Sequence, residues 1–151
     1  MRPYFTLAVD CEITVESHHY TSSEQELVQL NQAGVTRMRF GAESMDDSDL
    51  TRIGRPGAVH QTILAVAQAR VAGFTNINLD VMYGLPGQSL EGWQRTLTHC
   101  LTLAPTHLSC YALTVEEGTR LASNIQHRRS PAPDEGLQIE MDEPAQRRPG
   151  H

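Results

Sequence analysis

The chain has 151 residues, of which 39% are hydrophobic and 20% are charged, and its formal net charge is -6. This composition is typical of a single soluble domain with a buried core. The negative charge and the low aromatic content argue against a nucleic-acid surface, and the sequence has no apolar run near the ~20 residues that a membrane-spanning helix needs. Three scattered cysteines are typical of reduced thiols, so we expect a cytoplasmic protein.

Four strand-like segments alternate with helical patterns along the chain, which predicts the α/β class. The first helix can form a capping box between Ser23 and Glu26 and has a glycine stop at Gly34, and Ser89 can cap the fourth helix. This order favours right-handed crossovers, and therefore about four parallel strands with outer helices. The predicted strands are 11–17, 36–44, 76–81 and 107–115, and the predicted helices are 23–34, 46–53, 58–73 and 89–105. The predicted buried face of the third helix comprises Val59, Ile63, Ala67 and Val71.

The last part of the chain differs in composition, because it is rich in proline and charge after Arg120. We predict a loop from Ser130 to Gln138, at most one short helix after it, and a disordered end. The sequence is therefore divided into a folded unit, residues 1–129, and a tail, residues 130–151.

The third predicted strand has an unusual polar face. Within 76–81, apolar residues alternate strictly with Asn76, Asn78 and Asp80, although short amides and carboxylates are poor strand formers. If helices cover the apolar face, the polar groups point inward, where each unpaired group costs about 1–3 kcal/mol. Asp80, like Glu16 in the first strand, lies near the strand end where parallel α/β proteins bind ligands. The pattern leaves open both a polar ligand site and a structural network with trapped water.

A series of motifs in a fixed order extends from Asp10 to Glu143. The motifs are CEITVES, AGVTRMRFGAESMDDSDLTRIGR, ARVAGF, NINLDVMYGLPGQSLEGWQRTL, HLSCYALTVEEGT and PAPDEGLQ. Together they resemble the radical S-adenosylmethionine (SAM) proteins of the oxygen-independent coproporphyrinogen III oxidase family, and most of all its haem-chaperone branch. The resemblance implies a partial (β/α) barrel of the radical SAM type over residues 1–129, SAM and a [4Fe–4S] cluster as family cofactors, and haem or a porphyrin as a partner.

The resemblance also implies roles for five positions of the cofactor site. Glu16 matches the carboxylate that meets the amino group of SAM, and Arg55 matches the residue that pairs with its carboxylate. Asp80 matches the acid that hydrogen-bonds the ribose, and Thr114 matches a main-chain contact. Glu43 stands where the family normally has a glutamine that contacts the ribose. These roles are chemically reasonable because a zwitterion needs one anion and one cation, and a diol needs an acceptor.

The sequence also departs from the pattern of the family. The family holds its cluster on a CxxxCxxC loop, and these 151 residues contain no such motif. Cys11, Cys100 and Cys110 are predicted on different elements, so we expect them to be small buried side chains rather than cluster ligands. Glu43 adds a negative charge near the other acids, which is expected to weaken the site, and Arg39 occupies a strand position that is usually small and polar.

We therefore expect a fragment of a radical SAM protein of porphyrin and haem metabolism, which begins after two of six strands and ends before the C-terminal domain. Such a fragment would keep part of the SAM site. The family resembles radical SAM oxidoreductases, but this chain would need a missing N-terminal segment for redox chemistry. We therefore expect the chain alone to be inactive. The alternatives are a non-catalytic module that binds SAM or a tetrapyrrole, and a non-functional remnant.

Overall fold

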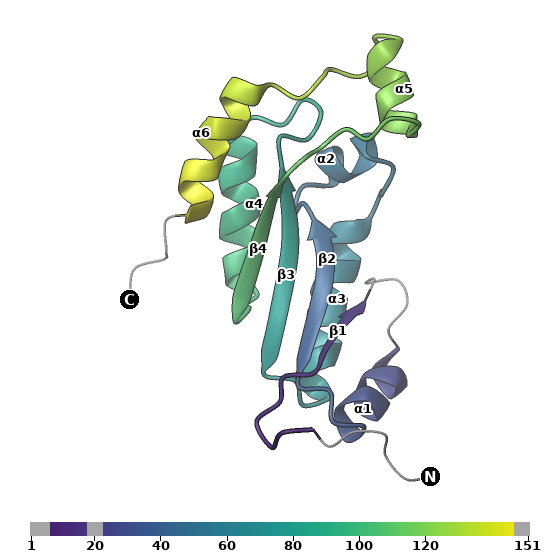
Figure 1. The fold of residues 1–151 in the computed structure, drawn as a ribbon, viewed down its shortest axis with the longest axis vertical. Helices are drawn as coiled ribbons and strands as arrows, with labels where there is room; N and C mark the ends of the chain where they lie inside the picture. Colours follow the sequence, from purple (N-terminus) through teal and green to yellow (C-terminus); the bar gives the residue numbers. More distant parts are fainter. Residues whose placement is uncertain (1–6, 18–22, 147–151) are drawn as a thin grey trace.

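The sheet at the centre of the protein has four parallel strands in the order β1-β2-β3-β4 (Figure 1). The structure, a computed structural model, describes residues 7–17 and 23–146. The observed order and direction confirm the predicted α/β class with four parallel strands. The strands are β1 Thr14–Ser17, β2 Arg37–Glu43, β3 Asn76–Tyr83 and β4 His107–Ala112.

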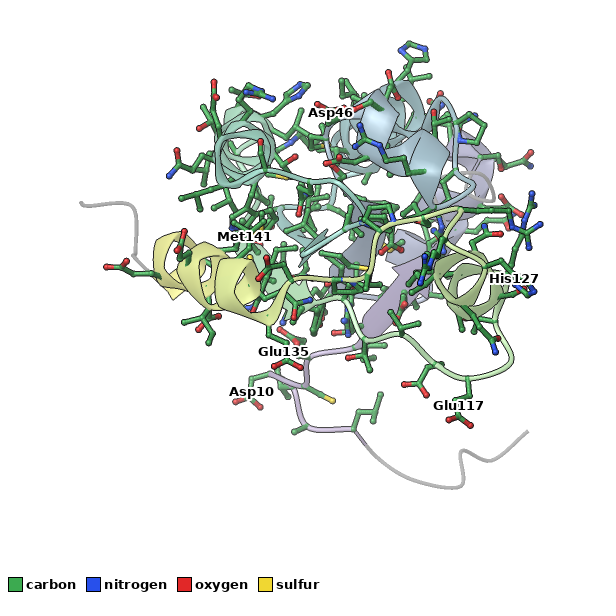
Figure 2. All side chains as sticks on the ribbon, turned by 90° about the horizontal axis from the view of Figure 1, so that it is seen from above. Asp10, Asp46, Glu117, His127, Glu135 and Met141 are labelled. Atoms are coloured by element: carbon green, nitrogen blue, oxygen red, sulfur yellow. The ribbon has the colours of Figure 1, made fainter. Side chains whose placement is uncertain are left out.

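Helices between the strands cover one face of the sheet. Figure 1 shows α3 and α4 behind the strands, and Figure 2, seen from above, shows Asp10 and Glu117 on the other side of the sheet. In the described part of the chain, no helix is both long and apolar enough to cross a membrane. The helices are α1 Glu24–Gln32, α2 Asp47–Arg52, α3 Ala58–Val71, α4 Leu90–Thr102, α5 Arg120–Gln126 and α6 Glu135–Gln146.

The core lies between the sheet and these helices, because β2 and β3 each bury every second side chain on that side. Full burial of a large apolar side chain stabilises the fold by about 1.5–3 kcal/mol. Trp93 of α4 is also fully buried and its ring lies 5.4 Å from that of Tyr83. The fully buried strand residues are Met38, Phe40, Ala42, Ile77, Leu79 and Val81.

The predicted helix ends are confirmed. Ser23 Oγ accepts a hydrogen bond from the Glu26 amide, and the Glu26 carboxylate accepts one from the Ser23 amide at 2.8 Å. Gly34 follows α1 with a φ of +94°, which a glycine adopts without strain. Ser89 Oγ caps α4 by accepting from the Gly92 amide at 3.1 Å.

Two predictions about helix faces and strand ends are wrong. In α3, Ala67 is exposed and Val71 is 74% exposed, whereas Thr62 and Ala69 are buried. The helix is apolar on most sides, so the spacing of its apolar residues did not distinguish the buried face. The fourth strand ends at Ala112 rather than at residue 115.

The predicted tail is also different from the expectation. The loop predicted from Ser130 to Gln138 is wrong from Glu135 onward, because α6 begins there, and α5 was not predicted. Met141 of α6 is fully buried, and its carbonyl accepts a hydrogen bond from Trp93 Nε1 at 2.8 Å. In Figure 2, α6 is the yellow helix near the label of Met141 and α5 is the green helix near the label of His127, and the two lie on opposite flanks of the sheet. Residues 147–151, for which disorder was predicted, lie outside the described residues, and the division at 129 stays a prediction.

Candidate functional site

The polar side chains of β3 lie on the sheet face opposite the helices and pair with neighbouring strands; Asn78 and Asp80 are buried there, and Asn76 is half-buried. Asn78 is fully buried, and its Oδ1 accepts hydrogen bonds from Arg37 Nη2 at 3.3 Å and from Ser109 Oγ at 3.2 Å. Asn76 Oδ1 accepts from Thr106 Oγ1 at 2.8 Å. Strong local partners therefore compensate the amides for their burial. The predicted inward face is confirmed, and its members bind one another.

A small cavity lies at the carboxyl end of this face, and we call it the acidic cavity. Its volume is about 190 Å³. Gly41 of β2 is the register partner of Asp80, so β2 has no side chain at the position beside that carboxylate. A Cβ at Gly41 would lie 3.2 Å from Glu43 Oε1, which shows how closely the glutamate folds over this position. The lining residues are Glu16, Ser17, Gly41, Glu43, Asp80, Met82 and Tyr111.

Glu43 is held in a strained backbone conformation at the end of β2. The pairing of β2 with β3 shifts between Gly41 and Glu43, and Glu43 has a φ of +62°. A left-handed conformation costs a residue with a side chain about 1–2 kcal/mol, and such strain is concentrated at ligand sites. The Glu43 carboxylate forms an ion pair with Arg55, with 3.1 Å between Oε1 and Nη1. The irregular strand end thus brings together two of the predicted site residues.

A larger cavity of about 330 Å³ adjoins the first, and we call it the basic cavity. It shares Glu43 and Met82 with the acidic cavity, and three arginines line it: Arg52, Arg55 and Arg120. Arg120 begins α5 and makes no ion pair with any described residue. The carboxyl edge of the sheet therefore carries a group of acids directly beside a group of arginines.

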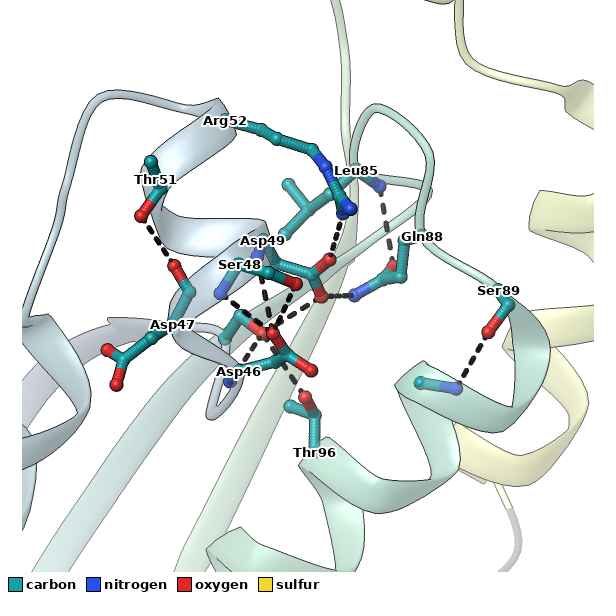
Figure 3. Close-up of polar contacts among 12 residues, drawn as sticks. Asp46, Asp47, Ser48, Asp49, Thr51, Arg52, Leu85, Gln88, Ser89 and Thr96 are labelled. Carbon is teal, nitrogen blue, oxygen red and sulfur yellow. Dashed lines mark hydrogen bonds and ion pairs between the residues drawn. The ribbon is translucent and has the colours of Figure 1, made fainter.

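A buried polar network around Asp49 supports the wall of the basic cavity (Figure 3). Asp49 Oδ2 accepts hydrogen bonds from Ser44 Oγ at 3.2 Å and from Gln88 Nε2 at 3.0 Å, and Oδ1 accepts from Arg52 Nη1 at 3.0 Å. Gln88 Oε1 in turn accepts from the amides of Gly84 and Leu85, which form the turn after β3. The network fixes the ends of β2 and β3 relative to α2.

The cysteines do not form a metal site in the part of the chain that the structure describes. Cys100 is fully buried on α4, whereas Cys110 in β4 and Cys11 before β1 are half-buried, so the expected burial is confirmed only for Cys100. Burial raises the pKa of Cys100 to about 12 and that of Cys110 to about 11, so both are protonated thiols in the protein without metal. Residues 7–17 and 23–146 hold no group of three potential metal ligands.

Four of the five predicted site residues line the two adjoining cavities. Glu16 and Asp80 line the acidic one, Arg55 lines the basic one, and Glu43 lines both. Thr114 is exposed and belongs to neither lining, although the preceding residue lines the basic cavity. The roles implied by the resemblance stay predictions at all five positions.

Sequence reasoning missed several residues that shape the cavities. Tyr111 lies two residues after Ser109 and on the same inward face of β4, so the period of the strand could have identified it. Arg120 could not be placed, because it belongs to a helix that the sequence did not predict. In the sequence Arg39 stands out only as a large charged residue at a strand position that is usually small and polar. In the structure its Nε donates a hydrogen bond to Asp80 Oδ2 at 2.5 Å. The predicted crowding of acids is therefore offset, since arginines pair with both Asp80 and Glu43.

Comparison with known proteins identifies the family. Residues 4–100 match the family model of the radical SAM superfamily. The chain is 36% identical over 135 residues to the mitochondrial radical S-adenosyl methionine domain-containing protein 1 of Mus musculus, covering 89% of this chain and 30% of that protein. It is 37% identical over 123 residues to the heme chaperone HemW of Escherichia coli K12, covering 82% of this chain and 32% of HemW. The chain thus spans about a third of the length of these relatives.

Solved structures agree with this assignment at the level of the fold. Coproporphyrinogen III oxidase (HemN) from Escherichia coli superposes with a TM-score of 0.78 at 24% identity, over 93% of this chain and 32% of HemN. The Elp3 protein of Methanocaldococcus infernus gives the same TM-score of 0.78 at 25% identity, over 87% of this chain and 31% of Elp3. The predicted resemblance and the partial barrel are confirmed. The chain belongs to the radical SAM superfamily, among its HemW-like members.

Proposed function

We propose that this chain supplies the methionine-binding and ribose-binding side of a SAM site in a coproporphyrinogen oxidase-like or haem-chaperone protein. The observation that carries the proposal is the acidic cavity directly beside the basic cavity at the carboxyl edge of the strands. SAM has groups that match this division of charge, because its ammonium, sulfonium and hydroxyl groups suit acids and its carboxylate suits arginine.

The residues present fit the amino-acid end and the ribose of SAM. Glu16 binds the ammonium group, and Asp80 and Glu43 accept hydrogen bonds from the ribose hydroxyls. Arg55 binds the carboxylate of SAM. Its Nη1 is buried and lies 3.1 Å from Glu43 Oε1, but the two atoms are not aligned for a hydrogen bond. The N–H groups of Nη1 can therefore donate to the carboxylate. Thr114 contributes a main-chain contact from the loop after β4. In a radical SAM protein, bound SAM supplies a sulfonium bond that is cleaved reductively with electrons from a [4Fe–4S] cluster.

The residues present do not fit the cluster itself. The three cysteines lie on separate elements, and residues 7–17 and 23–146 contain no group of three potential metal ligands. We therefore propose that the cluster ligands lie outside these 151 residues, and that the chain alone is inactive in redox chemistry. A second candidate function, a SAM-binding module that performs no chemistry, is supported by the same two cavities without cluster ligands.

Calorimetric titration of the chain with SAM tests the binding site. Wild-type protein is expected to bind SAM, and Glu16→Gln and Arg55→Gln are each expected to weaken binding about tenfold, the value of one charged hydrogen bond. Glu91→Gln and Arg95→Gln are matched controls, because these residues form an exposed pair on α4, and they are expected to leave the affinity unchanged. Absence of binding at millimolar SAM, or equal losses in the controls, would contradict the proposal and favour a non-functional remnant.

Anaerobic reconstitution with iron and sulfide tests the statement about the cluster. The chain is expected to remain colourless and to give no iron–sulfur signal in electron paramagnetic resonance after reduction. A stoichiometric [4Fe–4S] cluster on this chain would contradict the proposal. Reading the DNA upstream of Met1 for an in-frame CxxxCxxC then separates the radical SAM protein, in which the motif is expected, from the binding module.

The wider role that we propose lies in porphyrin and haem metabolism, with haem or a porphyrin as a partner of the whole protein. Support comes from the relatives named heme chaperone HemW in Mycobacterium tuberculosis, Bacillus subtilis and Escherichia coli, which match 91%, 86% and 82% of this chain. The cytoplasmic location stays a prediction.

A further inference from the structure

Both oxygens of the Asp80 carboxylate are already bound by donors from the same chain. Oδ1 accepts a hydrogen bond from Asn78 Nδ2 at 2.6 Å, and Oδ2 accepts one from Arg39 Nε at 2.5 Å. The side chain of Asp80 is only 10% exposed, so little of the carboxylate is open to solvent. A hydroxyl group that enters the acidic cavity therefore meets an acid whose charge is balanced by Arg39 and whose two oxygens each already accept one hydrogen bond.

Arg39 is held over this acid from a second strand. Its Nη2 donates a hydrogen bond to Tyr111 Oη at 2.5 Å, and its guanidinium carbon lies 5.9 Å from the centre of the tyrosine ring. The side chain thus extends from β2 across β3 to β4, above Asp80. The hydrogen bond with Asp80 raises the pKa of Arg39, so the arginine remains charged at every physiological pH.

The arginine is nevertheless in a position to leave. Its side chain is 33% exposed, and Tyr111 is also exposed, so the guanidinium can move into water while the backbone of β2 stays in place. Rehydration in water compensates a charged guanidinium for the lost ion pair, which is why partly exposed pairs are weak.

We propose that Arg39 is an internal competitor for the ligand of Asp80, which pairs with this carboxylate at the edge of the acidic cavity in the free protein and moves out when a diol binds. The inference rests on the proposed SAM site and adds a regulatory residue to it. In this account Arg39 lowers the affinity of the chain for any ligand that donates hydroxyl groups to Asp80. It affects binding of the amino-acid end less, through its positive charge beside Glu16, its register partner.

Calorimetry with three probes tests this competitor. Arg39→Ser is expected to bind SAM and adenosine about tenfold more tightly than wild type, as the release of one charged hydrogen bond predicts. L-methionine, which lacks the diol, is expected to gain less affinity than either, because it gains only from the loss of the positive charge beside Glu16. Arg95→Ser is the control: Arg95 pairs with Glu91 on the exposed surface of α4 and lines neither cavity, so this variant is expected to behave as wild type.

The outcomes separate the inference from the function on which it rests. Binding of SAM or methionine to wild type, without tighter binding of adenosine to Arg39→Ser, would overturn the competitor and leave the SAM site standing. Absence of binding of all three probes to both proteins would overturn the SAM site and the competitor together. If Arg39→Ser does not fold, Tyr111→Phe removes one anchor of Arg39, and a gain in adenosine affinity is still expected; an unchanged affinity in that variant would overturn the inference.

Discussion

Replacement of Asp49 by alanine tests the support beneath the two cavities. Asp49 is 3% exposed, and Asp49→Ala leaves Gln88 Nε2 without its buried acceptor, at a cost of about 1–3 kcal/mol. Ser44 Oγ loses one partner but keeps Thr96 Oγ1 at 3.2 Å. The ion pair with Arg52 adds little, because the arginine side chain is 44% exposed. We expect the free energy of unfolding to decrease by about 3 kcal/mol, since the loss of buried hydrogen bonds dominates.

Urea unfolding monitored by circular dichroism measures this change in free energy. In a thermal scan of the same variant, the melting temperature is expected to decrease by about 6–12 °C, given a chain of this length. Asp49→Asn is the matched control, since its amide oxygen can still accept from Ser44 and Gln88 while its nitrogen faces Arg52, which can turn to water. We expect this variant to cost about 1 kcal/mol. A loss below about 1 kcal/mol for alanine, or equal losses for alanine and asparagine, would refute the assigned role of the network.

Three further predictions concern other parts of the fold. Gly84→Ala is expected to destabilise the protein and loosen α6, because the new Cβ would lie 2.4 Å from the Gln138 side chain of that helix. Gly87→Ala has a similar φ of +72°, but its Cβ would make only ordinary contacts with Arg52, the nearest at 3.8 Å, so it is expected to cost only the strain of about 1 kcal/mol; urea unfolding with tryptophan fluorescence distinguishes the two. Iodoacetamide at about pH 8 is expected to spare Cys100 and Cys110 in the folded protein, because their pKa values are raised to about 12 and about 11, and to modify all three cysteines in urea, as mass spectrometry would show; rapid labelling of either one in the folded protein would contradict their burial. Hydrogen bonds from Ser48 lower the pKa of Asp46, the N-cap of α2, so its stabilisation is present above its unfolded pKa of 3.8 and is lost as the pH decreases through the lower folded value; Asp46→Ala is therefore expected to cost about 1 kcal/mol at neutral pH and less in acid, and a loss independent of pH would contradict this.

The alternating strands were predictable because their period is a local property of the sequence. The polar residues of β3 were expected to face inward and to need partners, and the structure confirms both for Asn78 and Asp80. The helix ends at Ser23 and Ser89 were also predictable, because a cap depends on residues within one turn.

The rest depended on contacts between distant segments. The helix α6 follows a proline-rich stretch, and its stripe of Leu137, Met141 and Ala145 becomes meaningful only when Trp93 is known to lie beneath it. The ion pair of Arg39 could not be foreseen either, since it requires the register of β2 with β3. Local pattern thus predicted the faces of the strands, whereas the internal partners of the site required tertiary structure.

Mapping of SAM binding by nuclear magnetic resonance tests the central claim most directly. Backbone amide signals of the ¹⁵N-labelled chain would be followed during titration with SAM. The account predicts shifts at Glu16, Gly41 and Asp80 around the acidic cavity and at Arg55 near the basic cavity, with none along the exposed face of α4. Shifts that are confined to other surfaces, or no shifts at saturating SAM, would contradict the claim that the two adjoining cavities form one cofactor site.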